Sequence, residues 1–247
     1  MSKTVIVAGW HGVEAALSRP DVLPRRIWLE QGRSDERARR LTEMAAGLGV
    51  AVERVDAATL HRRSEGATHQ GVLAEVPAAP TLDESDLEEI LDGVSGAPLL
   101  LCLDGVQDPH NLGASLRVAA AAGVHAVIVP RDKSASLTPA ARKAAAGADF
   151  LVPLITVTNL ARTLDQLKAR GIWLIGAAGE ATQSIHEVDS RGAVAWVMGS
   201  EGSGLRRLTS ETCDYLARIP MAEGVESLNV STAAAVCLFE SVRQRRG

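Results

Sequence analysis

Aromatic side chains are scarce in this chain of 247 residues, which contains four Trp, two Phe and one Tyr. Many proteins that bind single-stranded nucleic acid stack successive bases on aromatic side chains. The composition leaves little room for recognition of that kind. Hydrophobic residues still make up 46% of the chain and charged residues 23%, which is typical of a globular protein rather than of a disordered one.

Cysteines are also few, and their spacing forms no motif. Cys102, Cys213 and Cys237 lie far apart and are odd in number, which argues against a disulfide framework and against a zinc site. We expect buried, reduced thiols in a cytoplasmic protein. The six histidines are scattered without the spacing of metal ligands, so the sequence predicts no bound metal.

Long apolar runs are missing as well. The most apolar stretch, residues 118–130, is broken by Gly123 and His125 and is shorter than the ~20 residues that a membrane span needs. The N-terminus lacks the charged and then apolar pattern of a secretory signal. We therefore expect a cytoplasmic protein without a membrane partner.

A deficit of positive charge at first argues against nucleic acid as a partner, because the net charge is −4 and the isoelectric point is near 5.9. The negative charge is confined to one segment, however. Residues 76–100 contain six acidic and no basic residues, whereas the parts on either side each carry a net charge of +1. The average charge is therefore a poor guide, and RNA binding stays open.

Short β-branched runs alternate with helical patterns along the whole chain, which predicts an α/β fold. The first 76 residues are expected to form a small domain. Residues 77–95 are expected to be an acidic linker, because two prolines favour an extended chain at its start. The small domain has predicted strands at 4–8, 27–30, 50–55 and 71–76 and predicted helices at 11–18 and 35–48.

Residues 96–247 are expected to form a larger domain with a parallel sheet, because its strands are apolar on both faces. Residues 230–238 of the last helix place apolar side chains on one stripe that faces the core. Strands are predicted at 99–103, 126–129, 151–155, 172–177, 193–198 and 216–219, and helices at 112–122, 139–146, 160–170, 205–212 and 230–245.

Residues 104–117, Asp-Gly-Val-Gln-Asp-Pro-His-Asn-Leu-Gly-Ala-Ser-Leu-Arg, are the first segment with chemical character. The segment follows an apolar strand and opens a helix, and Asn111 is placed where an N-cap belongs. Gly113 allows another element to approach closely, and Arg117 lies six residues after Asn111, off its helical face. Taken alone, a capped helix with one surface arginine explains the segment equally well.

A glycine-rich turn at residues 197–205, Val-Met-Gly-Ser-Glu-Gly-Ser-Gly-Leu, connects a predicted strand to a predicted helix. Its spacing differs from the dinucleotide motif G-x-G-x-x-G, and it lacks the lysine of a phosphate loop. Glu201 would repel a pyrophosphate, so a ligand with a cationic or neutral face fits better. A purely structural turn is the alternative.

Polar residues also crowd the opening of the last helix. Ile-Pro-Met at 219–221 is followed by Glu-Ser-Leu-Asn-Val-Ser at 226–231. Asn229 is a candidate cap, and Ser227 adds a hydroxyl close to the free backbone N–H groups of a helix start. An elaborate N-cap is the alternative.

Taken together and in this order, these segments resemble the three motifs of the SpoU family of RNA ribose methyltransferases, within the SPOUT superfamily. Residues 108–117 resemble the first motif, 199–204 the second, and 219–221 with 227–231 the third. Segments 10–17, 123–131 and 157–162 extend the resemblance over nearly the whole chain, toward members that methylate guanosine in bacterial 23S ribosomal RNA.

The resemblance implies a fold, a cofactor, a reaction and an assembly. The C-terminal part would be a SPOUT α/β domain with a deep trefoil knot, and the N-terminal part an L30e-like domain that binds the RNA substrate. The reaction would be methylation of the ribose 2′-hydroxyl of a guanosine in 23S ribosomal RNA, with S-adenosylmethionine as cofactor. The chain would act as a homodimer with the active site at the subunit interface. Family members that modify transfer RNA leave a tRNA 2′-O-methyltransferase as the alternative.

Site residues follow from the resemblance position by position. The backbone around Gly199, Ile219 and Leu228 would hold the cofactor, and Met221 would line the same pocket. The residues that match the family's catalytic set are Asn111, Arg117, Glu201, Ser227 and Asn229.

Methyl transfer needs the ribose hydroxyl aligned with the sulfonium and a route for the hydroxyl proton. The resemblance makes Arg117 the candidate base, although a guanidinium stays protonated far above neutral pH and then has no acceptor site. Either Arg117 is deprotonated briefly in a dry site, or it clamps a phosphate and stabilises the developing alkoxide. Glu201 and Asn229 are expected to orient groups rather than to carry the proton.

Two other function classes and the mode of RNA contact stay open at this point. A nucleotide-dependent enzyme on an open α/β sheet is disfavoured by the glycine spacing, and a non-catalytic RNA-binding relative is disfavoured because Arg117 and Asn229 are both present. Phosphate contacts are expected from arginines of the first domain, with solvated helix faces as the alternative. These arginines are Arg25, Arg26, Arg37, Arg39, Arg40, Arg62 and Arg63.

Overall fold

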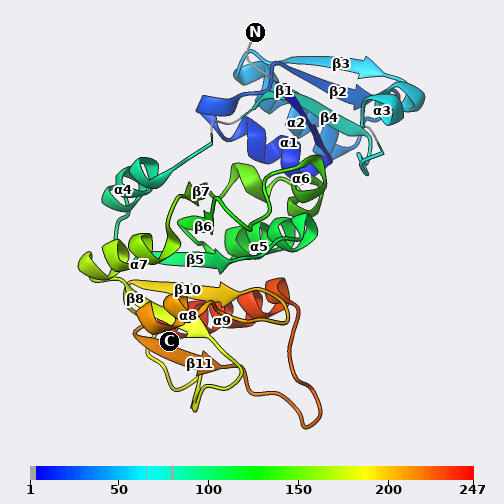
Figure 1. The fold of residues 1–247 in the computed structure, drawn as a ribbon. Coiled ribbons are helices and arrows are strands. Elements are labelled where there is room, and N and C mark those ends of the chain that lie inside the picture. Colours follow the sequence, from blue (N-terminus) through cyan, green and yellow to red (C-terminus); the bar gives the residue numbers. More distant parts are fainter. Residues whose placement is uncertain (1–3, 65, 79–80) are drawn as a thin grey trace. The chain divides into compact units, whose positions relative to one another are not determined.

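The computed structural model describes residues 4–64, 66–78 and 81–247, and Figure 1 shows the path of the chain. The chain divides into two compact units, of which the first comprises Met1–Pro80 together with Ala146–Leu151. The second unit comprises Thr81–Ala145 and Val152–Gly247. Residues 79 and 80 of the predicted linker lie outside the described residues.

The first unit is built on a mixed four-stranded sheet in the order β1-β4-β2-β3. Strand β4 runs antiparallel to β1 and β2, whereas β2 and β3 are parallel. The elements are β1 (Thr4–Ala8), α1 (Trp10–Leu17), η1 (Pro20–Val22), β2 (Arg26–Glu30), α2 (Glu36–Gly47), β3 (Ala51–Val55), α3 (Ala57–Arg63), β4 (Val72–Pro77) and the 3-10 turn η2 (Ala148–Phe150).

Side-chain caps explain where two helices of this unit begin. The carboxylate of Asp35 accepts the backbone N–H of Ala38 at 3.0 Å and starts α2. Asp56 does the same for α3, with Thr59 N at 2.7 Å. Helix α3 was not predicted, because its seven residues are too few to show a clear apolar period.

The second unit contains a seven-stranded parallel sheet in the order β7-β6-β5-β10-β8-β11-β9. All six residues of β5 are buried, as expected for a central parallel strand with helices on both faces. The strands are β5 (Leu99–Asp104), β6 (Ala126–Pro130), β7 (Leu154–Val157), β8 (Trp173–Ala177), β9 (Gln183–Ser184), β10 (Val194–Gly199) and β11 (Tyr215–Arg218). The helices are α4 (Glu84–Asp92), α5 (Pro109–Ala122), α6 (Pro139–Ala145), α7 (Leu160–Ala169), α8 (Arg207–Thr212) and α9 (Val230–Arg246).

These sheets confirm the predicted α/β class, with a parallel sheet in the C-terminal part. The trefoil knot, the L30e-like fold and the domain boundaries stay predictions. Within the predicted linker, the acidic segment forms helix α4, which a capping box between Asp83 and Asp86 starts. Leu87 and Leu91 of α4 are buried in a hydrophobic cluster with Leu164, so this segment packs into the second unit.

Among the element boundaries that differ from the prediction, two have clear local reasons. The cap of α5 is Asp108, whose carboxylate accepts the N–H of His110 at 2.9 Å, and Pro109 occupies the first helical position. Asn111 therefore lies in the first turn of α5, and the prediction that it caps this helix is wrong. Strand β7 begins three residues later than predicted, because Leu151 follows the 3-10 turn and is 56% exposed.

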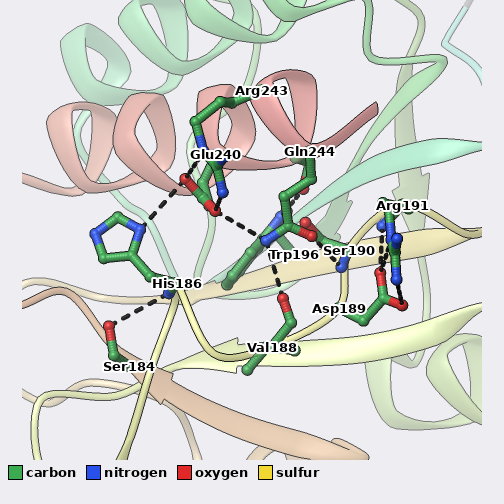
Figure 2. Close-up of polar contacts among 11 residues, drawn as sticks. Ser184, His186, Val188, Asp189, Ser190, Arg191, Trp196, Glu240, Arg243 and Gln244 are labelled. Carbon is green, nitrogen blue, oxygen red and sulfur yellow. Dashed lines mark hydrogen bonds and ion pairs between the residues drawn. The ribbon is translucent and has the colours of Figure 1, made fainter. Parts of the chain in front are cut away.

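Helix α9 is fixed along its C-terminal half by a polar network (Figure 2). The buried carboxylate of Glu240 accepts hydrogen bonds from Arg243 at 2.7 and 3.0 Å and from Gln244 at 2.8 Å, and His186 Nδ1 lies 3.3 Å away. These bonds hold the pKa of Glu240 well below its usual value, at about 2. Trp196 Nε1 of β10 donates to the Ser241 hydroxyl at 2.8 Å, which ties the helix to the central sheet.

The three cysteines are free thiols, and burial raises the pKa of each. Among the residues that the structure describes, no three His, Cys, Asp or Glu side chains are grouped as metal ligands. In the same part of the chain, none of the helices has the length and apolar character that crossing a membrane requires.

Candidate active site

The three motifs meet through one hydrogen-bonded group of side chains from α5, the glycine-rich turn and the start of α9. Asn111 Nδ2 donates to Glu201 Oε1 at 3.0 Å, and Asn229 Nδ2 donates to the same oxygen at 2.7 Å. Asn229 Nδ2 also lies 2.8 Å from Asn111 Oδ1. Residues separated by 90 and 118 positions in the sequence thus form one cluster, which we call the Asn–Glu–Asn cluster.

Asn229 has two tasks in this cluster, and they fix its amide. Its Oδ1 accepts from the backbone N–H of Ser231 at 3.0 Å and from the Ser231 hydroxyl at 2.6 Å, so it caps α9 as predicted. Its Nδ2 is thereby left to face Glu201 and Asn111. The start of α9 and the carboxylate of Glu201 are therefore held by opposite ends of one side chain.

The turn that carries Glu201 folds back tightly on itself after β10. Ser200 and Gly204 exchange backbone hydrogen bonds of 3.1 and 3.0 Å. A Cβ at Gly199 would lie 2.1 Å from the carbonyl carbon of Gly204, so a larger residue does not fit there. Gly202 and Gly204 have φ values of 84° and 64°, in the left-handed region that favours glycine. The glycines thus have a clear structural task, which is to place Glu201.

Helix α5 lies close to α6 at the point where the sequence has Gly113. A Cβ on Gly113 would lie 2.2 Å from the carbonyl oxygen of Ala141 and 2.6 Å from the Cβ of Ala144. The predicted close approach is confirmed, and the neighbour is α6. Because Asn111 precedes Gly113 by two residues, this contact also sets the position of Asn111, which is 9% exposed.

Two predicted catalytic residues lie outside the Asn–Glu–Asn cluster. Arg117 is exposed on α5, and the described part of the chain provides it with no hydrogen bond or ion pair. Ser227 is exposed in the segment before α9, and the same part of the chain provides no partner for its hydroxyl. The structure leaves both side chains available to molecules from solution.

The predicted cofactor residues lie at the carboxyl ends of neighbouring strands. Gly199 ends β10, and Ile219 directly follows β11. Met221 and Leu228 lie in an exposed run, and each side chain is 36% exposed. In a parallel α/β sheet, ligands bind at this edge.

Sequence reasoning missed two residues at this edge, Asp104 and Arg206. Asp104 ends β5 in register with Gly199, is only 1% exposed, and its Oδ1 lies 2.8 Å from Arg206 Nε. The sequence did contain one indication of Asp104, namely an aspartate at the end of an otherwise apolar strand. The arginine partner follows the glycine-rich turn, and no spacing rule links the two residues across about a hundred positions.

Comparison with known proteins identifies both parts of the chain. Residues 98–239 match the SpoU rRNA Methylase family, and residues 6–82 match the family described as RNA 2′-O ribose methyltransferase substrate binding. The 23S rRNA (guanosine-2′-O-)-methyltransferase RlmB of Pseudomonas aeruginosa is 54% identical over 245 residues, covering 99% of this chain and 98% of that protein.

Solved structures agree with these matches. A crystal structure of an RNA 2′-O ribose methyltransferase superposes with a TM-score of 0.80 at 28% identity, covering 100% of this chain and 90% of that one. The SpoU methyltransferase AviRb of Streptomyces viridochromogenes, in complex with its cofactor AdoMet, has the same fold, with a TM-score of 0.77 at 24% identity and coverage of 98% and 91%. The chain belongs to the SpoU rRNA methylase family.

Proposed function

We propose that this chain transfers a methyl group from S-adenosylmethionine to the ribose 2′-hydroxyl of a guanosine in 23S ribosomal RNA. The observation that carries the proposal is the Asn–Glu–Asn cluster, which joins residues of all three motifs within hydrogen-bond distance. The substrate follows from the RlmB relative of P. aeruginosa, which matches both units of the chain rather than the methylase part alone.

The residues at the carboxyl edge of the sheet suit S-adenosylmethionine, the cofactor that SpoU methyltransferases bind. Met221 and Leu228 offer apolar side chains to an adenine ring, and the exposed backbone of 221–229 offers hydrogen-bonding groups. The carboxylate of Glu201 suits a sulfonium cation. We place the cofactor against these residues together with Gly199 and Ile219. When bound, it supplies an electrophilic methyl group.

The chain's own residues then have to orient the ribose and manage one proton. We assign orientation to the Asn–Glu–Asn cluster and to the Ser227 hydroxyl. A guanidinium offers a planar set of N–H donors, so the exposed setting of Arg117 favours a donor role over that of a base. In this assignment Arg117 binds an RNA phosphate and stabilises the developing alkoxide, while the proton of the 2′-hydroxyl passes to solvent water, to which Arg117 is exposed.

The first unit is proposed to hold the RNA, as the matching family description suggests. The arginines of α2 are of two kinds. Arg37 donates to Glu14 with two bonds of 2.8 Å, so its charge is neutralised within the unit. Arg39 and Arg40 are exposed on α2, and the described residues provide them with no hydrogen bond or ion pair. We assign phosphate contacts to this second group.

We further propose that the chain acts as a homodimer in the cytoplasm, with the active site at the subunit interface. Val225, in the exposed segment before α9, is 49% exposed and offers an apolar side chain to such an interface. A cytoplasmic location follows from a ribosomal RNA substrate.

Transfer of labelled methyl groups from S-adenosylmethionine tests the reaction and separates the two RNA classes. Purified protein is incubated with 23S ribosomal RNA or with bulk tRNA, and the product nucleoside is identified. We expect 2′-O-methylguanosine in 23S RNA. Labelling confined to tRNA would favour the alternative substrate, and no labelling of either RNA would count against the reaction.

A further inference from the structure

Asp104 is a buried carboxylate for which the proposed chemistry has no task. It is the last residue of β5, opposite Gly199 in the register between β5 and β10, and its side chain is fully shielded from solvent. Burial of a carboxylate is costly unless hydrogen bonds or a cation compensate for the lost water. The partners of Asp104 therefore indicate what the burial achieves.

Both carboxylate oxygens are directed to one residue, Arg206. Oδ2 accepts the backbone N–H of Arg206 at 3.1 Å, and Oδ1 lies 2.8 Å from Arg206 Nε. The backbone bond fixes the position of Arg206, and its guanidinium adds an ion pair, since Oδ1 accepts no hydrogen bond from the described residues. Gly105, which follows Asp104, has a φ of 81°, in the left-handed region that favours glycine, and a Cβ there would be in ordinary contact with Arg206 Nη2 at 3.6 Å.

Arg206 directly follows the turn that carries Glu201. At the other end of this turn, Gly199 belongs to the sheet, and the Ser200–Gly204 pair closes the turn. The turn is consequently anchored at both ends to neighbouring strands, to β10 through the chain and to β5 through Asp104. Glu201 lies between the two anchors and donates nothing itself, so its place beside Asn111 and Asn229 depends on them.

We propose that Asp104 and Arg206 are a positioning pair that holds the glycine-rich turn, and with it Glu201, in the geometry needed for cofactor binding and methyl transfer. The proposal rests on the proposed function for its activity readout. The pair acts through Glu201 and through the backbone of the turn, without touching the reacting atoms.

Substitution of each partner tests the proposal. Arg206→Gln keeps the backbone N–H and removes the guanidinium, and Asp104→Asn removes the charge. Arg207→Gln is the matched control, because Arg207 is the next residue, is 74% exposed in its side chain and pairs with Glu211 at 2.8 Å on the surface of α8. Single-turnover rate at saturating RNA and cofactor, S-adenosylmethionine affinity by calorimetry, and Tm are measured for each.

We expect Arg206→Gln and Asp104→Asn to slow transfer by about 10- to 100-fold, as small displacements at a site do. The affinity for S-adenosylmethionine should fall by about tenfold. Because the two residues act as a unit, the double variant should lose no more rate or affinity than the more impaired of the two single variants. Arg206→Lys should recover part of the loss, and Arg207→Gln should match the wild type. Arg206→Gln should also lower Tm, because it leaves the buried carboxylate of Asp104 without its cation, so rate and affinity are measured well below the Tm of each variant.

A purely structural pair would behave differently. A lower Tm, with wild-type rate and affinity measured well below it, would overturn the proposal, and so would wild-type behaviour of Arg206→Gln. Cofactor affinity separates this proposal from the proposed function. If the wild type binds S-adenosylmethionine and methylates no RNA, the function fails, while the affinities of the variants still decide the role of the pair.

Discussion

The two units hold their polar side chains in different ways. In the second unit, Asn111, Glu201 and Asn229 are joined by bonds of 2.7–3.0 Å between elements far apart in sequence. In the first unit, Arg39 and Arg40 are exposed on one helix, and the described residues give their side chains no hydrogen bond or ion pair. The comparison distinguishes two tasks. Alignment of reacting groups needs side chains that are held in place, whereas attraction of RNA phosphates needs charges that are accessible.

Arg33 and Arg37 of the first unit differ from Arg39 and Arg40, because both are paired with carboxylates. They flank the ring of Trp10 at 5.2 and 5.3 Å, and their charges are paired with Asp35 at 2.9 Å and with Glu14 at 2.8 Å. The bonds from Arg37 hold the pKa of Glu14 below its usual value. These two arginines stabilise the fold of the unit, so a count of arginines overstates its capacity for RNA.

The largest effect is expected at Arg117. Arg117→Lys keeps a positive charge and removes the planar set of donors, and we expect methyl transfer to fall by about 10²- to 10³-fold. Cofactor affinity by calorimetry should stay unchanged, which separates this role from binding. Near-complete activity of the lysine variant in single-turnover assays would show that a point charge is enough.

Asn229 allows the two tasks of one side chain to be separated. Asn229→Ser keeps a good helix cap and removes the amide donor, whereas Asn229→Ala removes both. We expect both variants to lose about 10- to 100-fold in transfer rate, as when a preorganised donor is removed. Only the alanine variant should lose stability, by about 1 kcal/mol in urea titration. A serine variant with wild-type activity would mean that the Nδ2 bonds are dispensable.

Glu240 tests how firmly α9 is fixed. Glu240→Gln should lower the free energy of unfolding at pH 7 by about 1–3 kcal/mol, because Arg243 loses a buried anionic acceptor. Since the pKa of Glu240 is lowered from 4.5 to about 2 in the folded chain, its contribution is present above pH 4.5 and is lost as the pH falls toward 2. The difference in free energy of unfolding between the wild type and Glu240→Gln, measured by urea titration, should therefore shrink as the pH falls from 4.5 toward 2. A constant difference down to pH 2 would contradict this account.

The smallest effect is expected at the exposed arginines. Replacement of Arg39 and Arg40 by alanine should weaken RNA binding several-fold and reduce the slope of log K against log salt by about one per lost phosphate contact. Arg37→Ala is the control, because it should lower the stability of the first unit with little change in the slope. An unchanged slope in the Arg39/Arg40 variant would remove these residues from the interface.

Much of the fold was predictable because periodicity and apolar content are local. Strand β1 was predicted with its observed bounds, and the buried stripe of α9 is confirmed for Val230, Ala234, Cys237 and Leu238. Helix α3 and the two-residue strand β9 were missed, because such short elements are stabilised by their neighbours rather than by their own pattern.

The site was predictable only in part. The caps and the close approach at Gly113 leave local signals, whereas the bonds between Asn111, Glu201 and Asn229 depend on strand order. The misplaced cap of α5 shows the limit of local reasoning, since Asp108 and Asn111 are both good caps and Pro109 decides between them. The contact between Asp104 and Arg206 could not be predicted from the sequence, because only the parallel pairing of β5 and β10 brings the two residues together.

The most direct test of the central claim is a map of 2′-O-methyl groups in total RNA from a strain that lacks this gene. The account predicts that one guanosine in 23S ribosomal RNA loses its methyl group, and that the wild-type chain restores it while the Arg117→Lys variant does not. An unchanged 23S map, or a lost methyl group in tRNA alone, would contradict the account.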